Sequence, residues 1–172
     1  MRSAVWVLRH LISILLLPFV VVVVVPRWLL RSWAMSDTVW VEGTPLELIG
    51  HIAGILIFLC GFALFGWCVS LFARVGKGTL APWDPTQKLV AIGPYRYVRN
   101  PMISGVVTML IGESVFHGSR VLAVWAATFI ALNYIFFLIF EEPDLERRFG
   151  EDYRRYKAAV PRWIPRRTPW NG

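Results

Sequence analysis

Four long apolar runs set the pattern of the chain, with polar segments between them. A membrane-spanning helix needs about 20 predominantly apolar residues, each adding about 1.5 Å. The runs therefore predict four spans, at about 4–25, 46–72, 102–117 and 120–141. The third run is short, and a tight His-Gly-Ser stretch leads from it to the fourth, so we expect the last two spans to form a helical hairpin.

The loop before the third span, residues 76–101, is rich in glycine and proline. A continuous helix is excluded there, because proline lacks an N–H donor, fixes its own backbone angle and restricts the residue before it. Non-helical backbone at membrane depth survives only where protein buries it or where it lines a cavity. We therefore expect a shaped loop beside a cavity.

The C-terminal tail, residues 143–172, begins at Pro143, which we expect to end the fourth span. Apolar residues then recur every three or four positions, as in an amphipathic helix that lies in the membrane interface. These residues are Leu145, Phe149, Tyr153, Tyr156 and Val160, with Gly150 a candidate break among them. The last part repeats proline and is expected to be extended, either anchored in the headgroups by Trp163 and Trp170 or closing a cavity.

The composition agrees with a membrane protein. Hydrophobic residues make up 56% of the 172 residues and charged residues 17%, and the mean hydropathy is +0.55, whereas soluble domains are about 45–50% apolar and about 25% charged. This length predicts a single domain, residues 1–172. The expected fold is all-α: an integral membrane bundle of about four transmembrane helices with a C-terminal amphipathic interfacial helix.

The net charge of +7 follows membrane topology and does not indicate nucleic acid. With four spans, the N-terminus, the loop and the tail share one side, and only Arg27, Arg31 and Arg120 of the 18 basic residues lie on the other. By the positive-inside rule, the basic side faces the cytoplasm. We predict an inner membrane of a bacterium or archaeon, with both termini in the cytoplasm.

Three smaller features carry little chemistry. The first run has the charge and apolar core of a secretory signal but no small-x-small cleavage site, so we expect a retained helix. Cys60 and Cys68 predict buried apolar side chains, with neither a disulfide nor a metal cluster. Gly50 and Gly54 have the spacing of a helix-packing face.

Residues 93–102, GPYRYVRNPM, form a rigid, cationic and aromatic cassette before the third span. The hairpin brings this cassette to the membrane side where Glu141 and Glu142 end the fourth span. One carboxylate can then pair with Arg99 or accept hydrogen bonds from a ligand, contacts that are strong in partial desolvation. The alternative is that the arginines and tyrosines only anchor headgroups and that the glutamates only mark the water boundary.

The cassette and the later segment EEPDLERRFGEDYRRYKAAVPRWIP together resemble the isoprenylcysteine carboxyl methyltransferase and phospholipid methyltransferase superfamily. Its members are small integral membrane enzymes that use S-adenosylmethionine. The resemblance covers about residues 76–165 and implies a cofactor pocket at the cytoplasmic ends of the last two spans, closed by the tail and open to lipid at the side. It also implies a membrane lipid or another lipophilic small molecule as substrate.

The first family motif reads G-x-Y and then R-H-P-x-Y-x-G, and the second reads E-E-x-x-L, G-x-x-Y-x-x-Y and V-P. The matching residues are Gly93, Tyr95, Arg99, Pro101, Gly105, Glu141, Glu142, Leu145, Gly150, Tyr153, Tyr156, Val160 and Pro161. Asn100 stands where the family often has His, which removes a proton-transfer group. Ile103 stands where the family often has Tyr, which removes a hydroxyl.

By this resemblance, Arg99 and Glu142 are expected to be catalytic, and no metal is expected. The residues expected to bind the cofactor are Leu89, Val90, Gly93, Tyr95, Arg99, Asn100, Pro101, Glu141, Glu142, Tyr153 and Tyr156. Because successive helical residues are about 100° apart, the two glutamates face different ways. We expect Glu142 to contact the cofactor and Glu141 to lie near Arg99.

The methyl acceptor is open between a prenylcysteine-like carboxylate and a lipid amine. A carboxylate needs a cation to hold it, whereas an amine must lose a proton. No basic residue lies between Arg120 and Arg147, so a carboxylate would depend on Arg96, Arg99 or the tail arginines. Two other functions compete: an NADPH-dependent reductase of steroid-like lipids, whose family resembles this one in its last spans, and a non-catalytic membrane scaffold.

Overall fold

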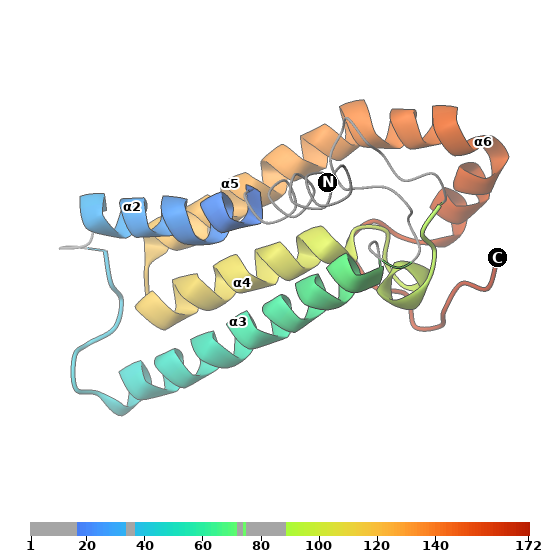
Figure 1. Ribbon diagram of the computed structural model, residues 1–172. Coiled ribbons are helices and arrows are strands. Elements are labelled where there is room, and N and C mark those ends of the chain that lie inside the picture. Colours follow the sequence, from blue (N-terminus) through green and yellow to red (C-terminus); the bar gives the residue numbers. More distant parts are fainter. Residues whose placement is uncertain (1–16, 34–36, 72–73, 75–88) are drawn as a thin grey trace, which may run out of the picture. The chain divides into compact units, whose positions relative to one another are not determined.

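The computed structural model describes residues 17–33, 37–71, 74 and 89–172 (Figure 1). Residues 4–16 of the predicted first span and residues 76–88 of the predicted loop 76–101 lie outside these residues. The described elements are η1 (Val20–Val24), α2 (Val25–Trp33), α3 (Pro45–Leu71), η3 (Gly93–Arg96), α4 (Pro101–His117), α5 (Arg120–Phe136), η4 (Phe137–Glu141) and α6 (Glu142–Ala159). The prediction of an all-α fold is confirmed.

Two helices are long and apolar enough to cross a membrane: α3, and the helical run from Arg120 to Ala159, which is kinked at Gly150. The helix α4 is also apolar but shorter. Large side chains on α3, among them Ile52, Leu56 and Leu59, are more than half exposed. Such a surface is unfavourable in water, and lipid would cover it.

The contacts divide the chain into two compact units. One unit comprises Leu17–Phe65 and Ile103–Asn133. The described part of the other comprises residues 66–71, 74, 89–102 and 134–172. The cassette and the paired glutamates both belong to this second unit.

In the first unit, glycines bring the backbones of α3 and α4 into contact. A Cβ atom at Gly54 would lie 2.5 Å from the Phe116 nitrogen, and one at Gly61 would lie 2.6 Å from the Gly105 carbonyl oxygen. The packing role predicted for Gly54 is confirmed. Gly50 instead accommodates the Trp40 ring, 2.5 Å from the position of a Cβ.

The predicted hairpin is also confirmed, because only Gly118 and Ser119 separate α4 from α5. The segment before α3 closes over this turn. The Val39 N–H donates to the Gly118 carbonyl oxygen at 2.8 Å, and the Trp40 Nε1–H donates to the Val115 carbonyl oxygen at 2.9 Å. Within this unit, the segment before α3 therefore holds the turn of the hairpin.

The prediction that Pro143 stops the helix is wrong, since the helix continues through Pro143 as far as the kink at Gly150. A proline ring in an α-helix clashes with the carbonyl four residues before it. Here the π turn η4 comes first, and the Glu142 N–H donates to Phe137, five residues back. A wider turn of this kind relieves the clash. The predicted break at Gly150 is confirmed by its φ of 54° and ψ of −125°.

Replacing Gly61 by alanine is expected to lower the thermal midpoint of the detergent-purified protein. Overpacking against the α4 backbone costs about 1–3 kcal/mol, which exceeds the gain in helix propensity of about 1 kcal/mol. Gly66→Ala is the matched control in the same helix, because no atom lies within 4 Å of its Cβ position. Tryptophan fluorescence on heating measures both, and equal shifts in the two variants would contradict the close contact.

Candidate functional site

Glycine and proline make the cassette rigid. Gly93 has a φ of +56°, which favours glycine, and a Cβ there would meet Leu71 Cδ1 at 2.8 Å. The turn η3 follows, with Pro94 at its start, and the Tyr97 N–H donates to the Pro94 carbonyl oxygen at 3.0 Å. Pro101, which is fully buried, then begins α4.

Tyr95 joins the cassette to two other segments. Only 6% of the residue is exposed, so it is a packing residue and not part of an aromatic belt at the membrane surface. Its side chain hydrogen bonds with Cys68 of α3. Its carbonyl oxygen accepts a hydrogen bond from the Tyr156 hydroxyl of α6 at 2.7 Å.

The apolar stripe of α6 packs within the protein. Tyr153, Tyr156 and Val160 are buried, and Leu89 and Trp170 are among the partly buried residues that pack against them. The predicted amphipathic helix is present, but protein covers the face that the sequence assigned to the membrane interface. This cluster is the core on which the cassette rests.

The C-terminal segment, residues 161–172, is non-helical, bends at residues 162–164 and 167–168, and is hydrogen bonded to the cassette. The Arg99 N–H donates to the Pro161 carbonyl oxygen at 2.9 Å, and the Trp170 N–H donates to the Arg96 carbonyl oxygen at 3.0 Å. Arg96 Nε donates in turn to the Trp170 carbonyl oxygen at 2.7 Å. Trp170, predicted as a headgroup anchor, instead packs against Tyr156 with ring centroids 5.2 Å apart.

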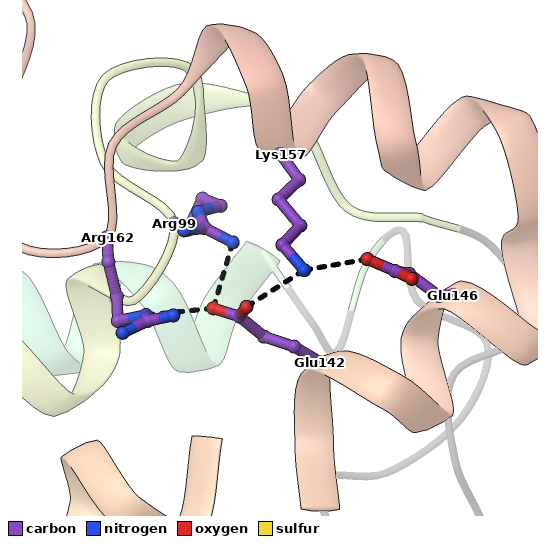
Figure 2. Close-up of polar contacts among 5 residues, drawn as sticks. All are labelled: Arg99, Glu142, Glu146, Lys157 and Arg162. Atoms are coloured by element: carbon purple, nitrogen blue, oxygen red, sulfur yellow. Dashed lines mark hydrogen bonds and ion pairs between the residues drawn. The ribbon is translucent and has the colours of Figure 1, made fainter. Parts of the chain in front are cut away.

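Three cations from three segments converge on the Glu142 carboxylate (Figure 2). Oε1 lies 2.9 Å from Arg99 Nη1 and 2.8 Å from Arg162 Nε. Oε2 lies 3.3 Å from Lys157 Nζ, which also contacts Glu146 Oε1 at 2.7 Å. With three cations and two carboxylates, this charge cluster has a net positive charge.

The cations keep Glu142 ionised although the residue is only 5% exposed. Burial by itself would raise the pKa of the Glu142 carboxyl, because it disfavours the charged form. The hydrogen bond from Arg162 and the charges of Arg99 and Arg162 outweigh burial and hold this pKa below its ordinary value of 4.5. Glu142 is therefore a fixed negative charge at neutral pH.

The partner expected for Arg99 differs from the one in the structure. Arg99 pairs with Glu142, not with Glu141. Glu141 is partly exposed and makes no ion pair within the described part of the chain. Arg99 Nε is a buried donor with no hydrogen-bond partner among the described residues, and such a donor costs free energy unless a ligand satisfies it.

All the residues predicted to bind the cofactor lie in the second unit. Arg99, Glu142 and Tyr153 are in direct contact, since Tyr153 hydrogen bonds with Arg99. Leu89 packs on the α6 cluster, and Val90 is buried. Asn100 stands directly before α4. The structure thus gathers these residues in one unit, while Gly93 and Pro101 shape the backbone between them.

Sequence reasoning missed Lys157 and Arg162. Both are cations among many in the tail, and no spacing rule separates them from the exposed Arg154 and Arg155. The available signal was their position, because each directly follows a residue of the second motif, Tyr156 or Pro161. Their contacts with Glu142 become visible only when the chain has folded back.

Two comparisons with known proteins bear on this site. The family model described as phospholipid methyltransferase matches residues 49–152. An uncharacterized protein of Haemophilus influenzae is 32% identical over 63 residues, which are 37% of this chain and the whole of that protein. The family match includes the cassette and both glutamates, and it ends within α6 before Lys157 and Arg162.

Replacing Glu142 by glutamine is expected to destabilise the protein by about 3–5 kcal/mol, because it leaves three cations without their shared partner. The wild-type pairing contributes stability above the ordinary pKa of 4.5, and this stability is lost as the pH falls through the lower folded-state pKa. Thermal melts between pH 7 and about pH 3 should therefore show a weaker acid dependence in Glu142→Gln. Glu151→Gln, at an exposed residue with longer ion pairs, is the control, and an equally large loss there would contradict the assignment.

Proposed function

Because the chain belongs to the phospholipid methyltransferase family, we propose that it methylates a lipid at the site formed by Arg99, Glu141 and the charge cluster. The methyl donor of this family is S-adenosylmethionine. The observation that carries the placement is the buried Arg99 Nε, an N–H donor that lacks an acceptor among the described residues. An anionic group of a ligand would satisfy it.

The residues around Arg99 fit this cofactor. The carboxylate of S-adenosylmethionine would accept a charge-assisted hydrogen bond from the Arg99 Nε–H. Its ammonium group or ribose hydroxyls would be held by Glu141, which has no cationic partner among the described residues. Tyr95, Tyr153 and Tyr156, which are buried, would keep water away from such a ligand. When bound, S-adenosylmethionine supplies an electrophilic methyl group on a sulfonium.

Glu142 has a different role in this proposal. Both of its oxygens already contact cations, so it holds Arg99 and has little capacity left for a ligand. Methyl transfer needs donor and acceptor in line, and holding them so accounts for most of the rate enhancement. A rigid cassette, fixed to α6 and to the C-terminal segment, supplies that positioning.

The engaged cations favour a lipid amine over a carboxylate as the methyl acceptor. A carboxylate would need a cation, but Arg99 and Arg162 are paired with Glu142, and Arg96 is bonded to Trp170. An amine must lose its proton before or during the transfer. Glu141 is the nearest carboxylate in sequence to the cluster that could accept it.

The number of membrane spans and their orientation are part of the same proposal. We expect four spans with the first at about residues 4–25, a single functional domain, and the cassette and both termini in the cytoplasm. The support is the distribution of basic residues across the predicted loops. The donor is made in the cytoplasm and the acceptor lies in the membrane, so a site at this surface can receive both.

S-adenosylhomocysteine, the product of the donor, is expected to bind the detergent-purified protein in isothermal titration calorimetry. Arg99→Gln should weaken binding by about 10- to 100-fold, because a hydrogen bond between charged groups contributes about 1.5–3 kcal/mol. Glu141→Gln should also weaken binding, because it removes the negative charge proposed to hold the ammonium group or the ribose hydroxyls. Arg167→Gln, at an exposed tail residue, should leave binding unchanged. Absence of binding to the folded wild type would reject this cofactor, and NADPH would be titrated next.

The methyl acceptor can be identified by whether the transferred methyl group is bonded to nitrogen or to a carboxylate oxygen. The protein is incubated with radiolabelled S-adenosylmethionine and with vesicles that contain either a lipid with a primary amine or a prenylcysteine. An N-methyl product resists mild base, whereas a methyl ester releases volatile methanol. We expect label that is stable to base in the amine-containing vesicles, and release of labelled methanol would instead support the carboxylate.

A further inference from the structure

The charge cluster contains two cations that the matched family region lacks. The family match ends at residue 152, whereas Lys157 and Arg162 follow it. Arg162 lies in the C-terminal segment, and its side chain is only 15% exposed. A cation that is mostly buried beside Glu142 can influence the residues that would contact a ligand.

We propose that Arg162 is a positioning residue that acts on Arg99 through Glu142; the proposal rests on the function proposed above. Glu142 Oε1 accepts hydrogen bonds from both guanidinium groups, at 2.9 Å from Arg99 Nη1 and 2.8 Å from Arg162 Nε (Figure 2). One oxygen atom therefore fixes both side chains. The orientation of Arg99 Nε towards a ligand depends on where this oxygen is held.

The backbone closes the same ring of contacts from the other side. The Arg99 N–H donates to the carbonyl oxygen of Pro161, the residue directly before Arg162. Pro161 thus holds the main chain of Arg99, while Arg162 holds its side chain through Glu142. A shift of the C-terminal segment would move both ends of Arg99 together.

Lys157 is less suited to this role. Its side chain is 37% exposed, it contacts the other oxygen of Glu142, and it lies closer to Glu146 at 2.7 Å. Arg162, by contrast, also packs over the Tyr134 ring, with its guanidinium carbon 5.0 Å from the ring centroid. Contacts on two sides define the orientation of the Arg162 guanidinium.

The first test compares the affinity for S-adenosylhomocysteine in calorimetry of full-length wild type, Arg162→Gln, Arg162→Lys and Arg167→Gln. We expect Arg162→Gln to bind about tenfold more weakly, within the range for residues that share one network. Arg162→Lys keeps the charge and should restore part of the affinity. Arg167→Gln, at an exposed position of the same segment, should bind as the wild type does.

A double-mutant cycle tests the route of the effect. If Arg162 acts through Glu142, then adding Arg162→Gln to Glu142→Gln should cause little further loss of affinity. Losses that add fully would show that Arg162 acts by another route and would overturn the proposal. Thermal midpoints measured without ligand show that each variant is folded, and Arg162→Lys serves if Arg162→Gln is not.

The pH dependence of S-adenosylhomocysteine binding separates a positioning role of Arg162 from a merely structural one. The groups that face Glu142 are Arg99, Lys157, Arg162, Tyr153 and Glu141. Arg162 lowers the pKa of the Glu142 carboxyl. In Arg162→Gln this pKa should rise, so the affinity for S-adenosylhomocysteine should begin to fall at a higher pH than in the wild type.

The outcomes of these tests are distinct. Wild-type affinity and an unchanged profile in Arg162→Gln would overturn this inference alone, whereas no binding to wild type would reject the proposed cofactor as well.

Discussion

One buried carboxylate joins the segments that make up the site. Glu142, on α6, contacts Arg99 of the cassette, Lys157 of its own helix and Arg162 of the C-terminal segment. A buried charge is tolerated only where neighbouring groups replace the water that it has lost. None of these segments can move away without leaving a charge unpaired. The position of the cassette therefore depends on where the helix presents this single residue.

The π turn η4 decides which glutamate occupies that place. A π turn adds one residue to the turn, and each residue rotates a helix by about 100°. Without the extra residue, a neighbour of Glu142 would face the cassette instead. A second π turn, Val20–Val24, likewise stands two residues before a proline, Pro26. In both places the wider turn lets the helix pass a proline.

The elements that depend on local sequence were predictable, and those that depend on how the chain folds back were not. Apolar length gave α3, and motif order brought Arg99 and the glutamates together. The continuation past Pro143 was missed, because a proline commonly ends a helix and nothing in the sequence announces the π turn. The partner of Arg99 was missed because two adjacent glutamates carry the same chemistry on different faces. Arg162 was missed because its contact depends on a turn of the chain after Val160.

The hydrogen bonds between the C-terminal segment and the cassette affect the order in which the protein can fold as it is made. Helical hairpins can form as soon as their two helices have been synthesised, and chains generally fold from the N-terminal end during synthesis. The cassette, however, donates a backbone hydrogen bond to the Pro161 carbonyl oxygen and accepts one from the Trp170 N–H. A ribosome-bound chain that has not yet exposed these residues would already hold its helices but not a finished site. The candidate site can therefore be completed only after residues 161–170 have been synthesised, later than the helices that it joins.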